Sequence, residues 1–61
     1  MQQFLDTQAV AQRYGVPVET VRKWRAAGTG PRGARFGRHV RYPLDELERW
    51  ERAQLDPQPA A

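Results

Sequence analysis

Cysteine, serine and asparagine are all absent from this chain of 61 residues, and histidine and lysine occur once each. Without cysteine, the chain can form neither a disulfide nor a thiolate metal site. Without serine, and with a single histidine, most pairings of a nucleophile with a general base are also missing. We therefore expect a protein that is not an enzyme and that uses no cofactor and no metal ion.

Long apolar runs are absent as well. No stretch is apolar enough for a signal peptide or a membrane span, so the sequence predicts a soluble, intracellular protein. The length allows one domain with a thin core, because a chain of this size buries only about 60% of the surface that its unfolded form exposes.

Acidic residues are missing from a long internal window. None of the seven acids lies between Thr20 and Leu44, whereas seven of the ten basic residues do. A solvated protein face normally mixes charges of both signs. The window therefore indicates a protein that binds a polyanion with one side.

Two short helices open the chain, in the segment FLDTQAVAQRYGVPVETVRKWRAAG. Asp6 can cap a first helix over residues 7–14, where apolar residues recur at helical spacing. Gly15 can end that helix in the left-handed conformation, and Pro17 suits the entry to a second helix over residues 18–26. So short a connection forces a sharp angle between the helices, which predicts a helix-turn-helix.

The second helix would be the recognition helix. Val21 and Trp24 are three residues apart and form its apolar stripe, so we assign Trp24 to the core rather than to a stacking role. The side chains around this stripe then point outward or lie on its flanks. They belong to Val18, Glu19, Arg22, Lys23 and Arg25.

A stretch with an arginine at every third position follows, GTGPRGARFGRHVRY. We interpret it as a β-hairpin with a three-residue turn at Gly37–His39, because this register keeps one apolar face whole and a two-residue turn would not. The expected apolar face holds Ala34, Phe36, Val40 and Tyr42. Arg38 would lie at the tip, and Arg35 would face Arg41.

The expected pairing of Arg35 with Arg41 is unfavourable, because like charges opposite each other destabilise a strand pair. A bound polyanion would supply the missing negative charge. Two alternative interpretations fit less well. A phosphate-cradling loop would need the Lys-Ser/Thr ending of a P-loop, and a disordered arginine–glycine tract would not need the spacing of Phe36, Val40 and Tyr42.

The segment YPLDELERWERAQL predicts a third helix that begins after Pro43. Asp45 and Glu46 fall in its first turn, where the helix dipole favours anions. Its apolar face holds Leu44, Leu47 and Trp50. Because the helix carries four acids, we expect it to face away from the polyanion and to clamp the core. The ordered domain would cover residues 1–55, and DPQPAA at 56–61 would be a disordered tail.

The ordered pattern as a whole resembles the small excisionase and AlpA-like branch of the MerR-type winged helix-turn-helix domains. The residues that carry the resemblance are LDTQAVAQRYGVPVETVRKWRAAG and RFGRHVRYPLDELERW, and the pattern covers Phe4 to Trp50. One departure is Pro17, where the family usually has a serine that caps the recognition helix. The resemblance implies a mainly α fold with a small β-hairpin: a helix-turn-helix, a two-stranded wing and a C-terminal helix.

The resemblance also implies how the chain would bind double-stranded DNA. The recognition helix would enter the major groove, and the wing would follow the backbone or the adjacent minor groove. By position, the base-reading residues would be Val18, Glu19 and Arg22, and the phosphate-binding residues would be Thr20, Lys23 and Arg25. The wing would contribute Arg35, Arg38, His39 and Arg41. Arg38 at the tip suits a narrow A·T-rich minor groove, and His39 is interpreted as a turn residue rather than a metal ligand.

Two functions share this expected fold. One is an excisionase, a recombination directionality factor that binds and bends attachment-site DNA to assist an integrase. The other is an AlpA-like transcriptional regulator of a mobile genetic element. MerR-type regulators carry a coiled coil after this domain and this chain ends instead, which favours the excisionase.

The expected partners are therefore double-stranded DNA, a site-specific integrase, and further copies of the chain lying head to tail on the DNA, with no membrane. The expected location is the cytoplasm, at the nucleoid, for a protein encoded by a bacterium, phage or plasmid.

Overall fold

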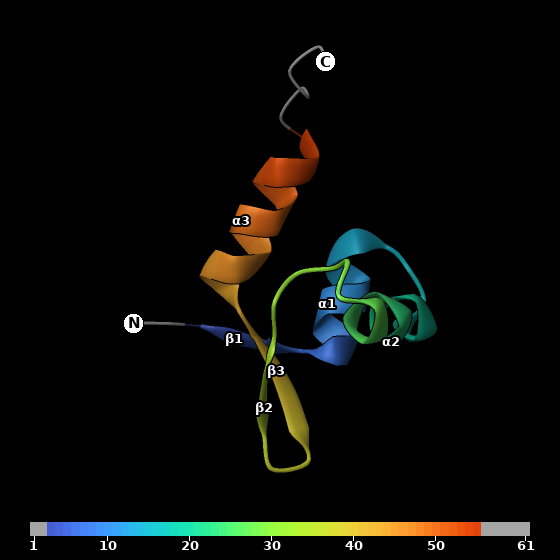
Figure 1. The fold of residues 1–61 in the computed structure, drawn as a ribbon, viewed down its shortest axis with the longest axis vertical. Helices are drawn as coiled ribbons and strands as arrows, with labels where there is room; N and C mark the ends of the chain where they lie inside the picture. The colour runs from blue at the N-terminus through green and yellow to red at the C-terminus, as the bar shows by residue number, and fades with distance from the viewer. Residues whose placement is uncertain (1–2, 56–61) are drawn as a thin grey trace.

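The computed structural model describes residues 3–55, so the tail expected at residues 56–61 lies outside the described residues. The elements follow in the order β1 (Phe4–Asp6), α1 (Thr7–Tyr14), α2 (Val18–Ala27), β2 (Ala34–Phe36), β3 (His39–Pro43) and α3 (Leu44–Leu55). In Figure 1, α1 and α2 pack beside the sheet, the β2–β3 hairpin projects at one end and α3 projects at the other. This arrangement is the winged helix-turn-helix that the sequence predicts, with one strand more than expected.

The helices of the helix-turn-helix begin and end at the capping residues that the sequence predicts. The Asp6 carboxylate caps α1 by accepting a hydrogen bond of 2.7 Å from the amide of Ala9. Gly15 ends α1 with φ 65°, and Gly28 ends α2 with φ 71°. Pro17 occupies the N-cap position of α2 and makes no side-chain capping bond. The predicted bounds of α1 are confirmed, and α2 runs one residue beyond its predicted end.

The sheet contains a strand that the sequence analysis missed. The strand order is β1-β3-β2, so β3 is central and pairs antiparallel with both neighbours. Leu5 of β1 lies opposite Tyr42 of β3, and both side chains contribute to the core. The hairpin is therefore not an isolated pair of strands, which would be marginally stable in water.

The predicted three-residue turn of the hairpin is wrong. Phe36 pairs with His39 and Arg35 pairs with Val40, which leaves a two-residue turn of Gly37 and Arg38. Gly37 has φ 64°, and a glycine at the first central position is what one type of two-residue hairpin turn requires. The local turn chemistry therefore sets the register, rather than the apolar pattern of the hairpin alone.

This register changes which side chains share a face. Val40 and Tyr42 face the core together with Leu5 of β1, whereas Phe36 lies on the opposite, outer face. The expected like-charge pair does not form, because Arg35 and Arg41 fall on opposite faces. Arg41 instead has Ala34 opposite it on β2 and Asp6 opposite it on β1. The predicted apolar face failed because it was sought in β2 and β3, whereas the apolar residues of the core face come from β1 and β3.

The core is small and draws on every helix. The buried hydrophobic residues are Val10, Ala11, Val21, Tyr42 and Leu47. The loop before β2 closes over this core through glycines. A Cβ on Gly33 would lie 2.9 Å from the Tyr42 ring, and a Cβ on Gly30 would lie 2.7 Å from that of Trp24. These two positions therefore have no room for a side chain.

Three aromatic rings connect α3 to the helix-turn-helix. The ring centroids of Tyr14 and Trp24 lie 6.1 Å apart, those of Tyr14 and Trp50 lie 5.4 Å apart, and those of the two tryptophans lie 5.1 Å apart. The indole N–H of Trp50 also donates to the carbonyl of Thr29 at 3.1 Å. Trp24 thus packs against the core, as predicted, and the apolar face of α3 reaches it.

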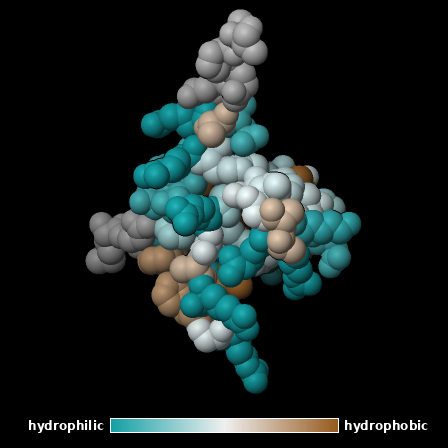
Figure 2. All heavy atoms as spheres, viewed as in Figure 1, coloured by the Kyte–Doolittle hydropathy of each residue, from teal (hydrophilic) through white to brown (hydrophobic). Residues whose placement is uncertain are grey.

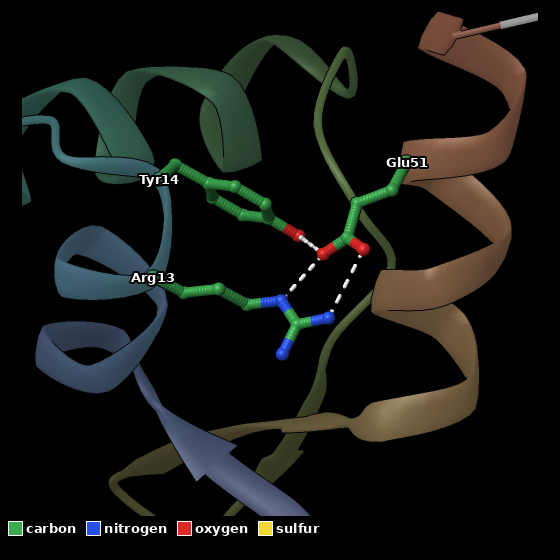
Figure 3. A network of polar contacts seen from close by, with 3 residues as sticks. All are labelled: Arg13, Tyr14 and Glu51. Atoms are coloured by element: carbon green, nitrogen blue, oxygen red, sulfur yellow. Dashed lines mark hydrogen bonds and ion pairs between the residues drawn. The ribbon is translucent and has the colours of Figure 1, made fainter.

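A polar network reinforces the same junction, shown in Figure 3. The Glu51 carboxylate accepts two hydrogen bonds from the Arg13 guanidinium, at 2.5 and 3.0 Å, and one from the Tyr14 hydroxyl at 2.6 Å. The bond from Arg13 lowers the pKa of Glu51 below its usual value. Burial, and then the bond to Glu51, raise the pKa of Tyr14. The bidentate geometry is the strong form of an arginine–carboxylate pair.

We predict that Glu51→Gln lowers the free energy of unfolding by about 1 kcal/mol at neutral pH, or the melting temperature by about 5 °C. Because the pKa of Glu51 is lowered in the folded state, its contribution is fully present above the unfolded-state pKa and is lost as pH falls through the folded-state pKa. Thermal melts by circular dichroism from neutral pH into acid measure the difference between the two proteins.

The matched control is Glu48→Gln, which changes an exposed glutamate on the same helix. Its melting temperature should stay near that of the unmodified chain throughout the titration. A difference between Glu51→Gln and the unmodified chain that persisted unchanged in strong acid would contradict an ionised Glu51 as the cause.

Candidate nucleic-acid interface

A hollow of about 420 Å³ lies between the start of α1, the outer side of α2 and the hairpin, and we call it the basic hollow. Its basic side chains come from two elements that are distant in sequence. They are Arg22 and Arg25 of α2, and Arg38, His39 and Arg41 of the hairpin. The fold therefore brings the two halves of the acid-free window together on one surface.

Asp6 is the one acidic side chain that lines the basic hollow. Its carboxylate already accepts a hydrogen bond from the amide of Ala9, as the cap of α1. Four arginines and one capping carboxylate leave the surface with excess positive charge. Several cations around a shallow hollow provide the complementarity that a phosphate backbone requires.

The recognition helix presents most of its predicted contact residues to solvent. Glu19, Arg22, Lys23 and Arg25 are exposed. Thr20 is half-buried, and Val18 is half-buried and packs against the core. Val18 therefore has a packing role that the sequence analysis did not assign, and the base-reading and phosphate-binding roles of the helix stay predictions.

The two predicted base-reading side chains of opposite charge lie beside each other. A guanidinium nitrogen of Arg22 is 3.6 Å from a carboxylate oxygen of Glu19, one helical turn apart, and both side chains are about 70% exposed. So exposed a pair contributes little to stability in water. The main effect of the Glu19–Arg22 pair is to place a hydrogen-bond donor and a hydrogen-bond acceptor next to each other on the outward face of α2.

The wing arginines differ in how far they are free to move. The guanidinium of Arg35 donates to the carbonyl of Gly37 at 2.9 Å, and that of Arg41 donates to the carbonyl of Val40 at 2.9 Å. Arg38 is exposed at the tip, beside the exposed His39. The hollow includes Arg38, His39 and Arg41, whereas Arg35 is not among the residues that line it.

Five residues that line the hollow were not predicted from the sequence as site residues: Asp6, Thr7, Gln8, Val40 and Tyr42. Thr7 and Gln8 form the first turn of α1, whose free amides and positive dipole end favour anions. Asp6 marked this helix start in the sequence, but nothing local indicated that it lies beside the wing. Burial raises the pKa of Tyr42, against the opposing effect of Arg25, so the hydroxyl stays neutral at pH 7.

Residues 3–55 contain neither a metal-binding cluster nor a membrane-spanning helix. In this part of the chain, no group of three or more histidine, cysteine, aspartate or glutamate side chains could hold a metal ion. None of the described helices is both long enough and apolar enough to cross a membrane.

A known protein family matches most of the chain. The family described as a helix-turn-helix domain matches residues 4–55, which include β1, both helices of the helix-turn-helix, the wing and α3. No curated protein matches the chain. The family match covers all the residues that line the basic hollow.

We predict that Arg22→Ala weakens binding to a preferred duplex by about 1–3 kcal/mol and relaxes sequence preference, as expected for an arginine that reads a base. Arg38→Ala should weaken binding to preferred and random duplexes alike, and should reduce the slope of log affinity against log salt by about one. Fluorescence anisotropy with labelled duplexes at several salt concentrations measures both quantities.

Arg49→Ala, on the exposed surface of α3, is the matched control and should leave affinity and salt slope unchanged. Duplex binding that did not depend on salt would contradict the hollow as a phosphate-binding surface.

Proposed function

The chain belongs to the helix-turn-helix domain family, which includes excisionase and AlpA-like proteins, and we propose that it is an excisionase that binds and bends attachment-site DNA to assist an integrase. A helix-turn-helix domain indicates DNA binding. The observation that supports DNA binding in this proposal is the hollow in which Arg22 and Arg25 of α2 meet Arg38 and Arg41 of the hairpin.

In the proposed complex, α2 lies in the major groove. A groove about 12 Å wide admits a helix, and an exposed face directs side chains at the base edges. Arg22 suits O6 and N7 of guanine, and Glu19 suits the N4 amino group of cytosine. Thr20, Lys23 and Arg25 bind phosphates, which set the register of the protein on the duplex.

The hairpin acts as the wing of the complex. Arg38 at its exposed tip enters the minor groove, where a narrow A·T-rich segment concentrates negative potential. His39 and Arg41 lie beside it on the hollow, and Arg35 follows the backbone. Deformation of the minor groove by a wing bends the duplex, which is the physical action that an excisionase needs.

Specificity in this proposal comes from several copies on one DNA. One recognition helix and one wing, as the described residues provide, cover a short site with limited discrimination. Copies that contact each other head to tail occupy direct repeats, because heterologous contacts extend rather than close. Bends at successive minor grooves then add up and bring the separated arms of an attachment site together for an integrase.

The second candidate is an AlpA-like transcriptional regulator of a mobile genetic element. The family match favours it equally, since the family includes AlpA-like proteins. In both candidates, the same basic hollow binds DNA. Neither candidate requires the chain to catalyse a reaction. In both, we propose a MerR-like chain that works in the cytoplasm, on the nucleoid of a bacterium or on phage or plasmid DNA.

We predict that excision in a purified system requires this chain. The reaction contains a site-specific integrase and linear DNA that carries its attachment sites, and recombinant products are counted with and without the chain. Footprinting should locate the chain on direct repeats, and end-to-end energy transfer should report a bend. The variant Arg38→Ala should lose excision together with the bend.

A different result in the same experiments would support the regulator. Occupancy of a promoter, with a change in transcription and no effect on recombination, would replace the excisionase with the regulator.

A further inference from the structure

Two exposed phenylalanines form an apolar patch on the outer face of the sheet. Phe36 of β2 is 53% exposed and Phe4 of β1 is 46% exposed. Their ring centroids lie 5.9 Å apart and the ring planes are at 86°, an edge-to-face contact. Among the described residues, the only other large hydrophobic side chain so exposed is Leu55 at the end of α3.

The register places this patch beside basic side chains. His39 lies opposite Phe36, and Arg41 lies on the same outer face two residues further along β3. Arg38 follows in the turn itself. Asp6, the acid of this face, lies opposite Arg41 and is engaged as the cap of α1. In Figure 2, apolar surface over the sheet is bordered by hydrophilic side chains.

These surroundings favour one type of partner. An apolar protein surface would have to desolvate the neighbouring cations without compensation, at a large energetic cost. A DNA minor groove provides both requirements, because sugars and base edges form its floor and phosphates line both sides. Apolar side chains on minor-groove proteins act there as wedges that partly unstack a base step and kink the duplex.

We propose that Phe36 is a DNA-contacting wedge on the outer face of the wing, held in place by the ring of Phe4. This inference rests on the proposed DNA binding by the wing and adds the residue that deforms the groove. Phe36 directly precedes the turn of Gly37 and Arg38, so it enters a groove together with the tip. Phe4 lies beside the far end of β3, opposite Pro43, and supports Phe36 from behind.

The test uses the full chain and a short duplex selected by that chain from a random pool. The duplex carries 2-aminopurine at successive A·T positions, which reports unstacking, and a dye pair at its ends, which reports bending. Phe36→Ala should weaken binding about ten-fold and remove most of the bend and the 2-aminopurine signal. Phe36→Leu, which keeps an apolar wedge, should stay within about three-fold of the unmodified chain.

Phe4→Ala is the matched control for the loss of the ring contact itself. It removes the same edge-to-face pair but leaves the wedge, so its affinity should fall only about two-fold, while its melting temperature should change as much as that of Phe36→Ala. Leu55→Ala, which is exposed at the end of α3, should change neither affinity nor bend.

Three results would overturn the inference. Phe36→Ala could bind and bend the duplex like the unmodified chain, while binding stays salt-dependent, which would reject the wedge and leave the proposed DNA binding intact. Equal losses of affinity in the Phe4→Ala and Phe36→Ala variants would show that the two phenylalanines only stabilise the folded sheet and that Phe36 is not a wedge. A chain that self-associates without DNA, and becomes monomeric with Phe36→Ala at unchanged affinity for one site, would assign the patch to a second copy.

Discussion

The pairing of β1 with β3 is the contact on which the rest of the structure depends. It brings Leu5 opposite Tyr42 on the core face, and it ends at Asp6, whose carboxylate then caps α1. At the other end of the same ladder, the amide of Leu44 donates to the carbonyl of Gln3 at 2.8 Å, where α3 begins. A three-residue strand thus sets the start of α1, the central strand of the sheet and the departure of α3.

So small a core needs contacts beyond apolar burial. The ring of Tyr42 is buried between the helices and the loop at Gly33, and the rings of Tyr14, Trp24 and Trp50 join the three helices. The Glu51 network adds charge-assisted bonds at the same junction. The acids of α3 are therefore not only a solvated face, since one of them, Glu51, holds α3 against α1, the helix that packs on α2.

The sequence was sufficient for the features that local chemistry determines. The helices could be predicted because Asp6, Gly15 and Gly28 act within one turn of their own positions. Glu19, Arg22, Lys23 and Arg25 of α2 followed from periodicity in the same way, whereas Val18 packs against the core. The hairpin register was mispredicted although Gly37 is a local signal for a two-residue turn, because the apolar face was sought within the hairpin alone. The apolar partner of β3 on that face is Leu5 of β1, more than thirty residues earlier in the chain. Thr7 and Gln8 were missed for the same reason: their place beside the wing comes from packing.

The register that was mispredicted changes the physical interpretation of the wing. With Arg35 and Arg41 on one face, the hairpin would have been a strained cluster of like charges that needed a polyanion in order to fold. With them on opposite faces, and with Arg35 and Arg41 each donating to a nearby backbone carbonyl, the hairpin forms without a like-charge pair. A wing that is already formed loses little conformational entropy on binding. The charges of the wing are therefore presented by a fold that three strands hold together, and not by a segment that a ligand has to order.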